Sequence, residues 1–441
     1  MKIMNKAIAV LLALVLISGT FVCFAADGEK QYHKYEKVML LGDSQNSGFS
    51  DYRDIFSEYT RVDDSFAAYV ADDLGAELLP YACPGFRTIE LRYLLDDTYR
   101  PDDKYLFAAV PTTPMEEFVR RAPELRNGIA ESDLIMIGIG GNDWGAYLGW
   151  VMADVELENP LPEEYKAALR KFLTDVSAED DVIEEILNIA NKLNALDEAA
   201  AALPEVLEYA FSNLRTNWEW IVEYIYENNP DVTLVVVGMF PTYFSTEKDA
   251  PDVVATPNAV EKMVEDGIID FGNKHLIEGQ SKYGYIYVDT YGTIVEEAHP
   301  TIAGQRFIAD RILEELPYGN FPYTADVALR DTNYKAIEYM VMNGIMEGTT
   351  ETTFGTDDAL TKAALSKALN KITGDYKITD KTGKVSKLDL AFNLFKAADK
   401  NGIMNFFNAV TFSLNILISG DNNITRGEAA GILYSYVKSF T

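Results

Sequence analysis

Two residues that stand far apart in the chain, Ser44 and His299, have side chains that could work together in catalysis. Ser44 follows an apolar segment closely, and His299 comes just before a helical pattern that begins at Ile302. A serine hydroxyl is a poor nucleophile at neutral pH and needs a nearby base to take its proton. Histidine can be that base because its ordinary pKa is about 6.5. Each residue alone also has a structural explanation, since Gly-Asp-Ser is a common turn and a single histidine is usually structural.

Asn142 is a third candidate, because it stands in Gly140-Gly141-Asn142-Asp143 at the end of another apolar segment. Its side-chain amide could donate a hydrogen bond to the negative oxygen that forms when a nucleophile attacks a carbonyl group. Such a donor typically contributes about 3 kcal/mol to the stabilisation of a transition state. The structural alternative is a turn in which glycine and asparagine supply a positive φ.

Four apolar segments are typical of buried strands, at 37–41, 134–139, 233–238 and 285–288. Helical patterns separate them, among them 64–74, 88–95 and the stripe Trp218, Ile221, Val222 and Ile225. Strands that alternate with helices predict a parallel sheet with helices on both faces. Ligands bind at the carboxyl ends of the strands in such a sheet, which is where Ser44 and Asn142 are expected.

A helical insertion is expected at about residues 151–216, after the Gly-Gly-Asn-Asp segment. Apolar residues repeat there at helical spacing, and the alternation of strands and helices stops. Long insertions in compact domains are often functional. Two roles stay open for this one, additional packing and a cap over a substrate cleft.

Taken in order along the chain, these segments resemble the sequence blocks of the GDSL/SGNH hydrolase family. Gly42-Asp43-Ser44 matches the first block, Gly140-Gly141-Asn142-Asp143 the third and His299-Pro300 the fifth, and Ala82-Cys83-Pro84-Gly85 resembles the second. The resemblance covers a hydrolase domain expected at 37–317. It implies an α/β fold of the flavodoxin-like three-layer type and the hydrolysis of carboxylic esters without a metal or other cofactor.

The same resemblance implies roles for individual residues. Ser44 would be the nucleophile and His299 its base, and Ser44, Gly85 and Asn142 would form the oxyanion hole. The family usually has aspartate three residues before the histidine, and Glu296 stands at that position here with Glu297 beside it. Two arrangements stay open, a triad completed by Glu296 and a dyad in which a carbonyl group orients the imidazole. The second block also departs from the family, which usually opens it with asparagine.

The composition changes near Pro317, and residues 318–322 are a candidate linker. The following segment, expected as a small all-α domain at 325–441, resembles an S-layer homology module. Such modules hold exported proteins to polymers of Gram-positive cell walls. The family's Thr-Arg-Ala-Glu motif is matched best at Thr425-Arg426-Gly427-Glu428, with weaker counterparts at Ser386-Lys387-Leu388-Asp389 and Thr361-Lys362-Ala363-Ala364.

These motifs allow two interpretations. Arg426, Lys387 and Lys362 could bind an anionic secondary cell-wall polymer through charge-assisted hydrogen bonds. Alternatively, the threonine or serine and the acid three residues later could be helix capping boxes with no role in binding.

The beginning of the chain and its charge indicate where the protein works. Lys2 and Lys6 precede an apolar run and a small-residue cleavage site before Ala26, so residues 1–25 are expected to be a secretory signal peptide. The alternative, a retained membrane anchor, is disfavoured because Ser18-Gly19-Thr20 shortens the apolar run. The net charge of −31 argues against nucleic acid as a partner. With three histidines and no cysteine cluster, the chain has no signature of a zinc site.

The sequence therefore predicts a secreted serine hydrolase that is attached to a Gram-positive type of cell wall and cleaves carboxylic esters. Lipid esters, acetylated polysaccharides and small acyl esters all suit the predicted chemistry. A rival of another class is a wall-anchored binding or scaffold protein whose hydrolase fold is catalytically inactive, since a fold alone does not establish an activity.

Overall fold

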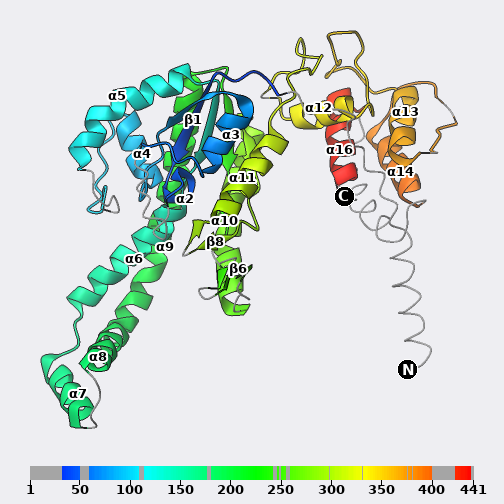
Figure 1. Ribbon diagram of the computed structural model, residues 1–441. Coiled ribbons are helices and arrows are strands. Elements are labelled where there is room, and N and C mark those ends of the chain that lie inside the picture. The colour runs from blue at the N-terminus through cyan, green and yellow to red at the C-terminus, as the bar shows by residue number, and fades with distance from the viewer. Residues whose placement is uncertain are drawn as a thin grey trace, which may run out of the picture. The chain divides into compact units, whose positions relative to one another are not determined.

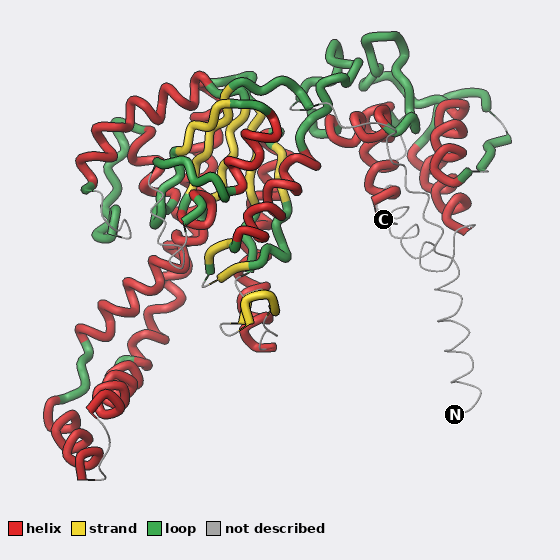
Figure 2. Tube along the Cα trace, viewed as in Figure 1, coloured by secondary structure: helices red, strands yellow, loops and turns green. Residues whose placement is uncertain are grey.

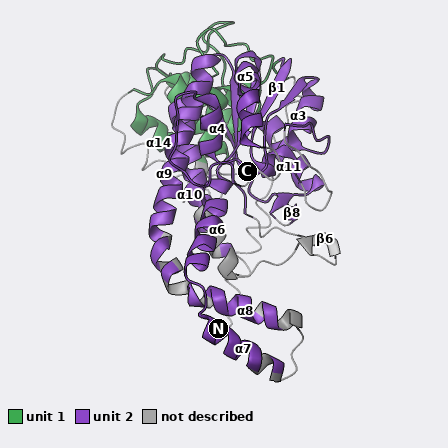
Figure 3. Ribbon diagram, turned by 90° about the vertical axis from the view of Figure 1, so that its left-hand side faces the viewer, with its two compact units in different colours: residues 1–33, 316–441 green, residues 34–315 purple. Residues whose placement is uncertain are grey.

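The computed structural model describes residues 32–49, 59–108, 114–175, 180–241, 246–247, 250–254, 259–296, 298–329, 331–374, 376–379, 381–399 and 423–438. The chain divides into two compact units, one of residues 34–315 and the other of the remaining residues at both chain ends (Figure 3). The expected signal peptide at 1–25 lies outside the described residues. None of the helices in the described ranges combines the length and apolar character that a membrane span requires.

Five parallel strands form the central sheet of the first unit (Figures 1 and 2): β1 (Lys37–Gly42), β2 (Glu77–Pro80), β3 (Leu134–Gly138), β4 (Thr233–Val237) and β7 (Ile286–Val288). Their order across the sheet is β2-β1-β3-β4-β7, which is the flavodoxin-like order of doubly wound folds. The predicted α/β class and its flavodoxin-like arrangement are confirmed. All residues of β3 and β4 are buried, as expected for strands covered on both faces.

Helices cover both faces of this sheet. Met39, Ile135 and Leu234 point into one core that also holds residues of three helices, α4 (Thr88–Leu95), α5 (Met115–Glu131) and α9 (Leu196–Asn228). α10 (Ala259–Tyr283) contributes Ile269 and Leu276 to the same core. Two further helices, α3 (Phe66–Leu74) and α11 (Ile302–Glu315), pack against each other and do not contribute to that core.

Several short elements were not expected from the sequence. β2 ends in Pro80, which lacks a backbone donor and is tolerated because β2 is an edge strand. Two antiparallel pairs lie outside the main sheet: β5 (Thr246–Glu247) with β6 (Ala250–Val254), and β8 (Val295–Glu296) with β9 (His299–Pro300). The second pair carries the candidate base and is described with the site.

The helical insertion is larger than the expected range of about 151–216. α6 (Gly141–Glu158) begins directly after β3, and the 33-residue α9 runs from the insertion back into the core. α6 and α9 pack side by side and extend away from the sheet, with α7 (Glu163–Asp175) and α8 (Asp180–Asn194) at the far end (Figure 1). Gly140 and Gly141 look like a turn in the sequence, and in the structure Gly141 is the first residue of α6.

The second unit contains α12 (Tyr334–Met342), α13 (Lys362–Thr373), α14 (Lys387–Asp399) and α16 (Arg426–Lys438). The expected linker at 318–322 belongs to this unit, because Phe321 is buried in its core. Three segments meet just before α13, α14 and α16. Leu360 N donates to Ile424 O (2.9 Å), Ile424 N to Val385 O (3.0 Å) and Val385 N to Leu360 O (2.8 Å), which closes a ring of three backbone hydrogen bonds.

Candidate active site

Ser44 is the first residue of α2 (Ser44–Ser47), a short helix that follows β1 after a one-residue link. Gly42 has a φ of +139°, and a methyl group there would lie 2.1 Å from the Gly138 carbonyl oxygen. Only glycine fits this turn, because any other residue would be strained at this φ and its side chain would clash with the backbone of Gly138. The chain therefore leaves the strand sharply, and Ser44 stands at the carboxyl end of the sheet, where such folds bind ligands.

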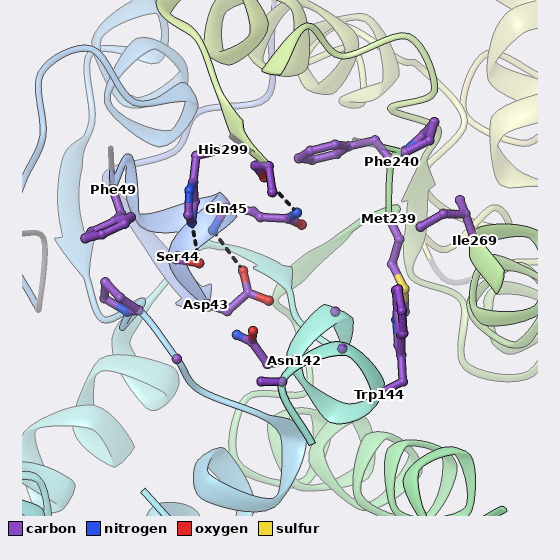
Figure 4. Close-up of a pocket in the computed structure, with 17 residues that line it drawn as sticks. Asp43, Ser44, Gln45, Phe49, Asn142, Trp144, Met239, Phe240, Ile269 and His299 are labelled. Carbon is purple, nitrogen blue, oxygen red and sulfur yellow. Dashed lines mark hydrogen bonds between the residues drawn. The ribbon is translucent and has the colours of Figure 1, made fainter. Parts of the chain in front are cut away.

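His299 meets Ser44 across this edge. Its Nε2 lies 3.0 Å from Ser44 Oγ, which is within hydrogen-bond distance. Figure 4 marks this contact with a dashed line. The ring of Phe49 contacts the imidazole edge to face, with 4.8 Å between the ring centroids. The structure thus brings together two residues that are 255 positions apart in the sequence.

The hairpin of β8 and β9 holds His299 in place. Its turn contains Ala298, which has a φ of +72°, a conformation that is uncommon outside glycine. Gln45, the residue after Ser44, donates from Nε2 to the Ala298 carbonyl oxygen at 3.2 Å. This bond joins the turn that carries Ser44 to the turn that carries His299.

Glu296 is the cross-strand partner of His299 in this hairpin. Directly opposed residues of an antiparallel pair present their side chains on the same face, with Cβ atoms about 4.5–5.5 Å apart. The register therefore puts the side chains of Glu296 and His299 on the same face of the hairpin. Its neighbour Glu297 lies outside the described residues.

Buried polar side chains support the nucleophile turn. Asp43 Oδ1 accepts hydrogen bonds from Gln45 N and Asn46 Nδ2, both at 3.0 Å, and Asn46 Nδ2 also donates to Gly138 O at 2.5 Å. Burial raises the pKa of Asp43 to about 7, although these hydrogen bonds act in the opposite direction. From α11, the fully buried Gln305 donates to Gln45 O at 3.4 Å and accepts from Phe66 N at 2.8 Å.

The two remaining oxyanion candidates lie beside Ser44 in the same cavity. Gly85 has a φ of +83°, and Asn142 stands in the first turn of α6. Asn142 Nδ2 donates to Phe86 O at 3.1 Å, so one amide hydrogen is used to orient the group and the second stays available. The next residue, Asp143, accepts from Thr88 N at 2.9 Å and from the Thr88 hydroxyl, and burial raises its pKa to about 7.

The cavity that contains these groups has a volume of about 530 Å³. Its walls are Asp43, Ser44, Gln45, Phe49, Pro84, Gly85, Gly141, Asn142, Trp144, Gly145, Ala146, Met239, Phe240, Pro241, Ile269, Ala298 and His299. Among the described residues of the insertion, only the beginning of α6 reaches the cavity. His, Cys, Asp and Glu side chains in the described ranges form no group of three that could hold a metal ion.

Four residues that the sequence did not single out contribute to this site: Gln45, Asn46, Phe49 and Gln305. Asn46 and Gln45 could have been noticed, because they are polar residues next to the candidate nucleophile. Gln305 carries a weaker signal, as a polar residue within the buried stripe of α11. Phe49 has no signal in the sequence.

The candidate wall-binding residues in the second unit have other contacts. Arg426 is buried, and its guanidinium donates from Nε to Phe354 O at 2.9 Å and from Nη2 to Glu347 O. Burial lowers the pKa of Arg426. Lys387 Nζ lies 4.0 Å from Glu428 Oε1, with 17% of the lysine side chain exposed.

The capping interpretation of the motifs is visible in the geometry. Thr425 Oγ1 accepts from Glu428 N at 3.1 Å, and Glu428 Oε2 accepts from Thr425 N at 2.9 Å. Ser386 and Asp389 make the same reciprocal pair, at 3.0 and 3.2 Å. The serine or threonine and the acid of these two motifs thus cap α14 and α16.

Comparison with known proteins finds likenesses for both units. The S-layer homology domain family matches residues 325–365, and no curated protein matches the chain. Among solved structures, an extracellular lipase from Streptomyces rimosus is 16% identical, with a TM-score of 0.34 and coverage of 64% of this chain and 99% of the lipase. A phospholipase A1 from Streptomyces albidoflavus is 17% identical, with the same TM-score and coverage.

A family two carbohydrate esterase from Clostridium thermocellum, in complex with cellohexaose, is 13% identical, with a TM-score of 0.30 and coverage of 65% of each chain. The strand order, rather than these distant likenesses, establishes the fold. Residues 325–365 thus match the S-layer homology domain family, and residues 34–315 form a flavodoxin-like α/β unit in which a serine and a histidine meet at the carboxyl edge of the sheet.

Proposed function

We propose that this protein is a secreted serine hydrolase that cleaves carboxylic esters while attached to the cell wall. The observation that carries the proposal is the 3.0 Å approach of His299 Nε2 to Ser44 Oγ inside a cavity that Gly85 and Asn142 also line. A nucleophile, its base and donors for an oxyanion are the parts that acyl transfer requires.

In the proposed reaction, Ser44 Oγ attacks the ester carbonyl carbon while His299 Nε2 takes the hydroxyl proton. The carbonyl oxygen becomes an oxyanion and accepts hydrogen bonds from the backbone N–H groups of Ser44 and Gly85 and from the Asn142 amide. His299 then protonates the leaving alcohol, and the acyl group stays on Ser44. Water repeats these steps against the acyl-enzyme, which releases the acid and restores the serine.

Glu296 is the proposed third member of the site. An acid beside the second ring nitrogen holds the histidine in the correct tautomer and stabilises the imidazolium that forms during attack. The cross-strand pairing of Glu296 with His299 supports this role. The dyad remains the alternative arrangement.

A labelling experiment tests the enzyme against the inactive scaffold. The purified protein is incubated with a fluorescent fluorophosphonate, and hydrolysis of p-nitrophenyl esters is measured in parallel. We expect Ser44 to be labelled and the esters to be hydrolysed, and we expect Ser44→Ala to abolish both without changing the circular dichroism spectrum. Hydrolysis that persists in Ser44→Ala, or a wild-type protein that neither reacts nor hydrolyses, contradicts the proposal.

Attachment to the wall is supported by the match of residues 325–365 to the S-layer homology domain. Because Arg426 donates to backbone carbonyls within its own unit, its replacement would confuse folding with binding. Lys362→Gln and Lys387→Gln are the cleaner variants. The full chain should sediment with purified Gram-positive walls, and less so with these variants or at high salt, which screens charge–charge contacts over about 8 Å at physiological ionic strength. A folded chain that stays in the supernatant leaves only the capping function for the motifs.

A further inference from the structure

The walls of the active-site cavity differ in chemistry from one side to the other. Ser44, Gln45, His299 and Asn142 supply polar groups, and Trp144, Met239 and Ile269 lie across from Ser44 in the view of Figure 4. Among the described residues that line the cavity, only Asp43 and His299 have ionisable side chains, and Asp43 is buried. A sugar ring would lose its hydrogen bonds to water against the apolar side, whereas a hydrocarbon chain loses none.

The apolar side is rigidly built. Met239 fills the space between two glycines, since a methyl group at Gly140 or Gly272 would come within 2.8 or 2.9 Å of its Cε. The backbone of Met239 is fixed by the buried Asn273 of α10, which accepts from Met239 N and donates to Met239 O, both at 2.8 Å. A wall that is fixed on two sides keeps its shape when a ligand binds.

Gly145 is a glycine of the cavity wall around which there is open space. Gly145 lines the cavity from the second turn of α6, and an added Cβ there would meet nothing within 4 Å. Glycine in a helix interior is destabilising relative to alanine. Its φ is not positive, so the helix geometry does not require glycine. Gly145 thus leaves open the part of the cavity that any larger side chain would fill.

We propose that the cavity binds the acyl chain of a medium-chain ester, and that Gly145 sets how long a chain it admits. This inference rests on the proposed function and narrows its substrate to acyl esters longer than acetates. The volume of about 530 Å³ lies within the range of about 300–1,000 Å³ that is usual for small-molecule sites. Trp144, Met239 and Ile269 would contact the methylene groups of the chain.

The same helix provides a matched control. Gly149 stands four residues after Gly145 in α6, an added Cβ there also meets nothing within 4 Å, and Gly149 does not line the cavity. Gly145→Leu and Gly149→Leu therefore make the same chemical change in the same helix. Only the first adds a side chain at a position that lines the cavity.

The test measures kcat/KM for p-nitrophenyl esters from acetate to palmitate. For the wild type we expect a maximum at medium length, near octanoate. Gly145→Leu should lower the ratio of the octanoate value to the acetate value by about tenfold or more, because a blocked apolar pocket discriminates by roughly 10- to 200-fold per methylene-sized difference. Gly149→Leu should retain the wild-type profile.

Three outcomes overturn the inference without touching the proposed function. The first is a wild type that prefers acetate, and the second is a Gly145→Leu profile that matches that of Gly149→Leu. The third is a preference for chain length that is absent when the acyl chain is varied and appears only when acetate esters of alcohols of increasing length are compared. The last result would assign the cavity to the alcohol. A wild type that hydrolyses none of these esters and resists the fluorophosphonate would instead refute the proposed function itself.

Discussion

Ser44 and His299 meet because each follows a turn with an unusual backbone conformation. Gly42 allows the chain to leave β1 where a side chain would strike Gly138, and Ala298 adopts a positive φ just before the histidine. The Gln45 amide joins these two turns through the Ala298 carbonyl. The relative position of Ser44 and His299 therefore depends on the two turn conformations and on the side-chain hydrogen bond that joins the turns.

The first prediction at this scale concerns the acid. Glu296→Gln should lower kcat substantially with little change in KM, because the amide cannot stabilise the imidazolium. Glu297→Gln is the neighbouring control and should have little effect. Steady-state kinetics with one p-nitrophenyl ester decide the matter, and near-normal rates in both variants would establish a dyad.

The second prediction concerns the oxyanion. Asn142→Ala should lower kcat by about 100-fold or more with a modest change in KM, because the donor acts mainly in the transition state. The value of kcat and the rate of labelling by the fluorophosphonate should fall together. A change confined to KM would assign Asn142 to substrate binding.

The third prediction concerns pH and stability. An unfolded aspartate titrates near pH 4, whereas burial raises the pKa of Asp43 to about 7 in the folded protein. The carboxyl's contribution to stability is therefore complete below pH 4 and is lost as the pH rises through 7. Asp43→Asn keeps an oxygen for both hydrogen bonds and removes the charge. The Tm of Asp43→Asn minus the Tm of the wild type should be larger at pH 8 than at pH 5. An equal difference in Tm at the two pH values would contradict the shifted pKa.

At the scale of elements, a buried ionic cluster joins the core of the first unit to the helical insertion. Arg87, just before α4, pairs with Glu90 and Asp103, and all three side chains are at most 3% exposed. Its guanidinium also lies 5.2 Å from the ring of Trp150 in α6, and Tyr209 of α9 donates to Asp103 at 3.2 Å. The cluster thus fixes α6, which carries Asn142 and Gly145, against the loop that carries Gly85.

The prediction for these elements is a loss of stability. Arg87→Met leaves two buried carboxylates without their partner and should cost about 3–5 kcal/mol of unfolding free energy. Arg120→Met is the control, because Arg120 and Glu117 form an exposed pair of the same i,i+3 spacing in α5, which should contribute at most about 1 kcal/mol. Urea denaturation compares the two, and similar losses would show that the cluster is not critical.

At the scale of the whole molecule, the proposed catalytic residues and the segment that matches the S-layer homology family belong to different compact units with separate apolar cores. A chain limited to residues 34–315 should stay folded and hydrolyse esters with kcat/KM within about twofold of the full protein. It should no longer sediment with wall preparations. Loss of activity in this folded fragment would mean that the second unit contributes to catalysis.

The sequence by itself determined the α/β class, because continuous apolar strands between helical patterns can be buried only in a covered parallel sheet. It also singled out Ser44, Gly85, Asn142, His299 and Glu296, because residues that carry chemistry stand in short local motifs. Only the tertiary structure decided that Ser44 and His299 touch, that Gln45 joins their turns, and that Arg426 points into its own unit. Those contacts depend on turn conformations and on packing between segments far apart in the chain, which no local pattern records. For the same reason Gly145 looks unremarkable in the sequence and becomes informative only as part of a cavity wall.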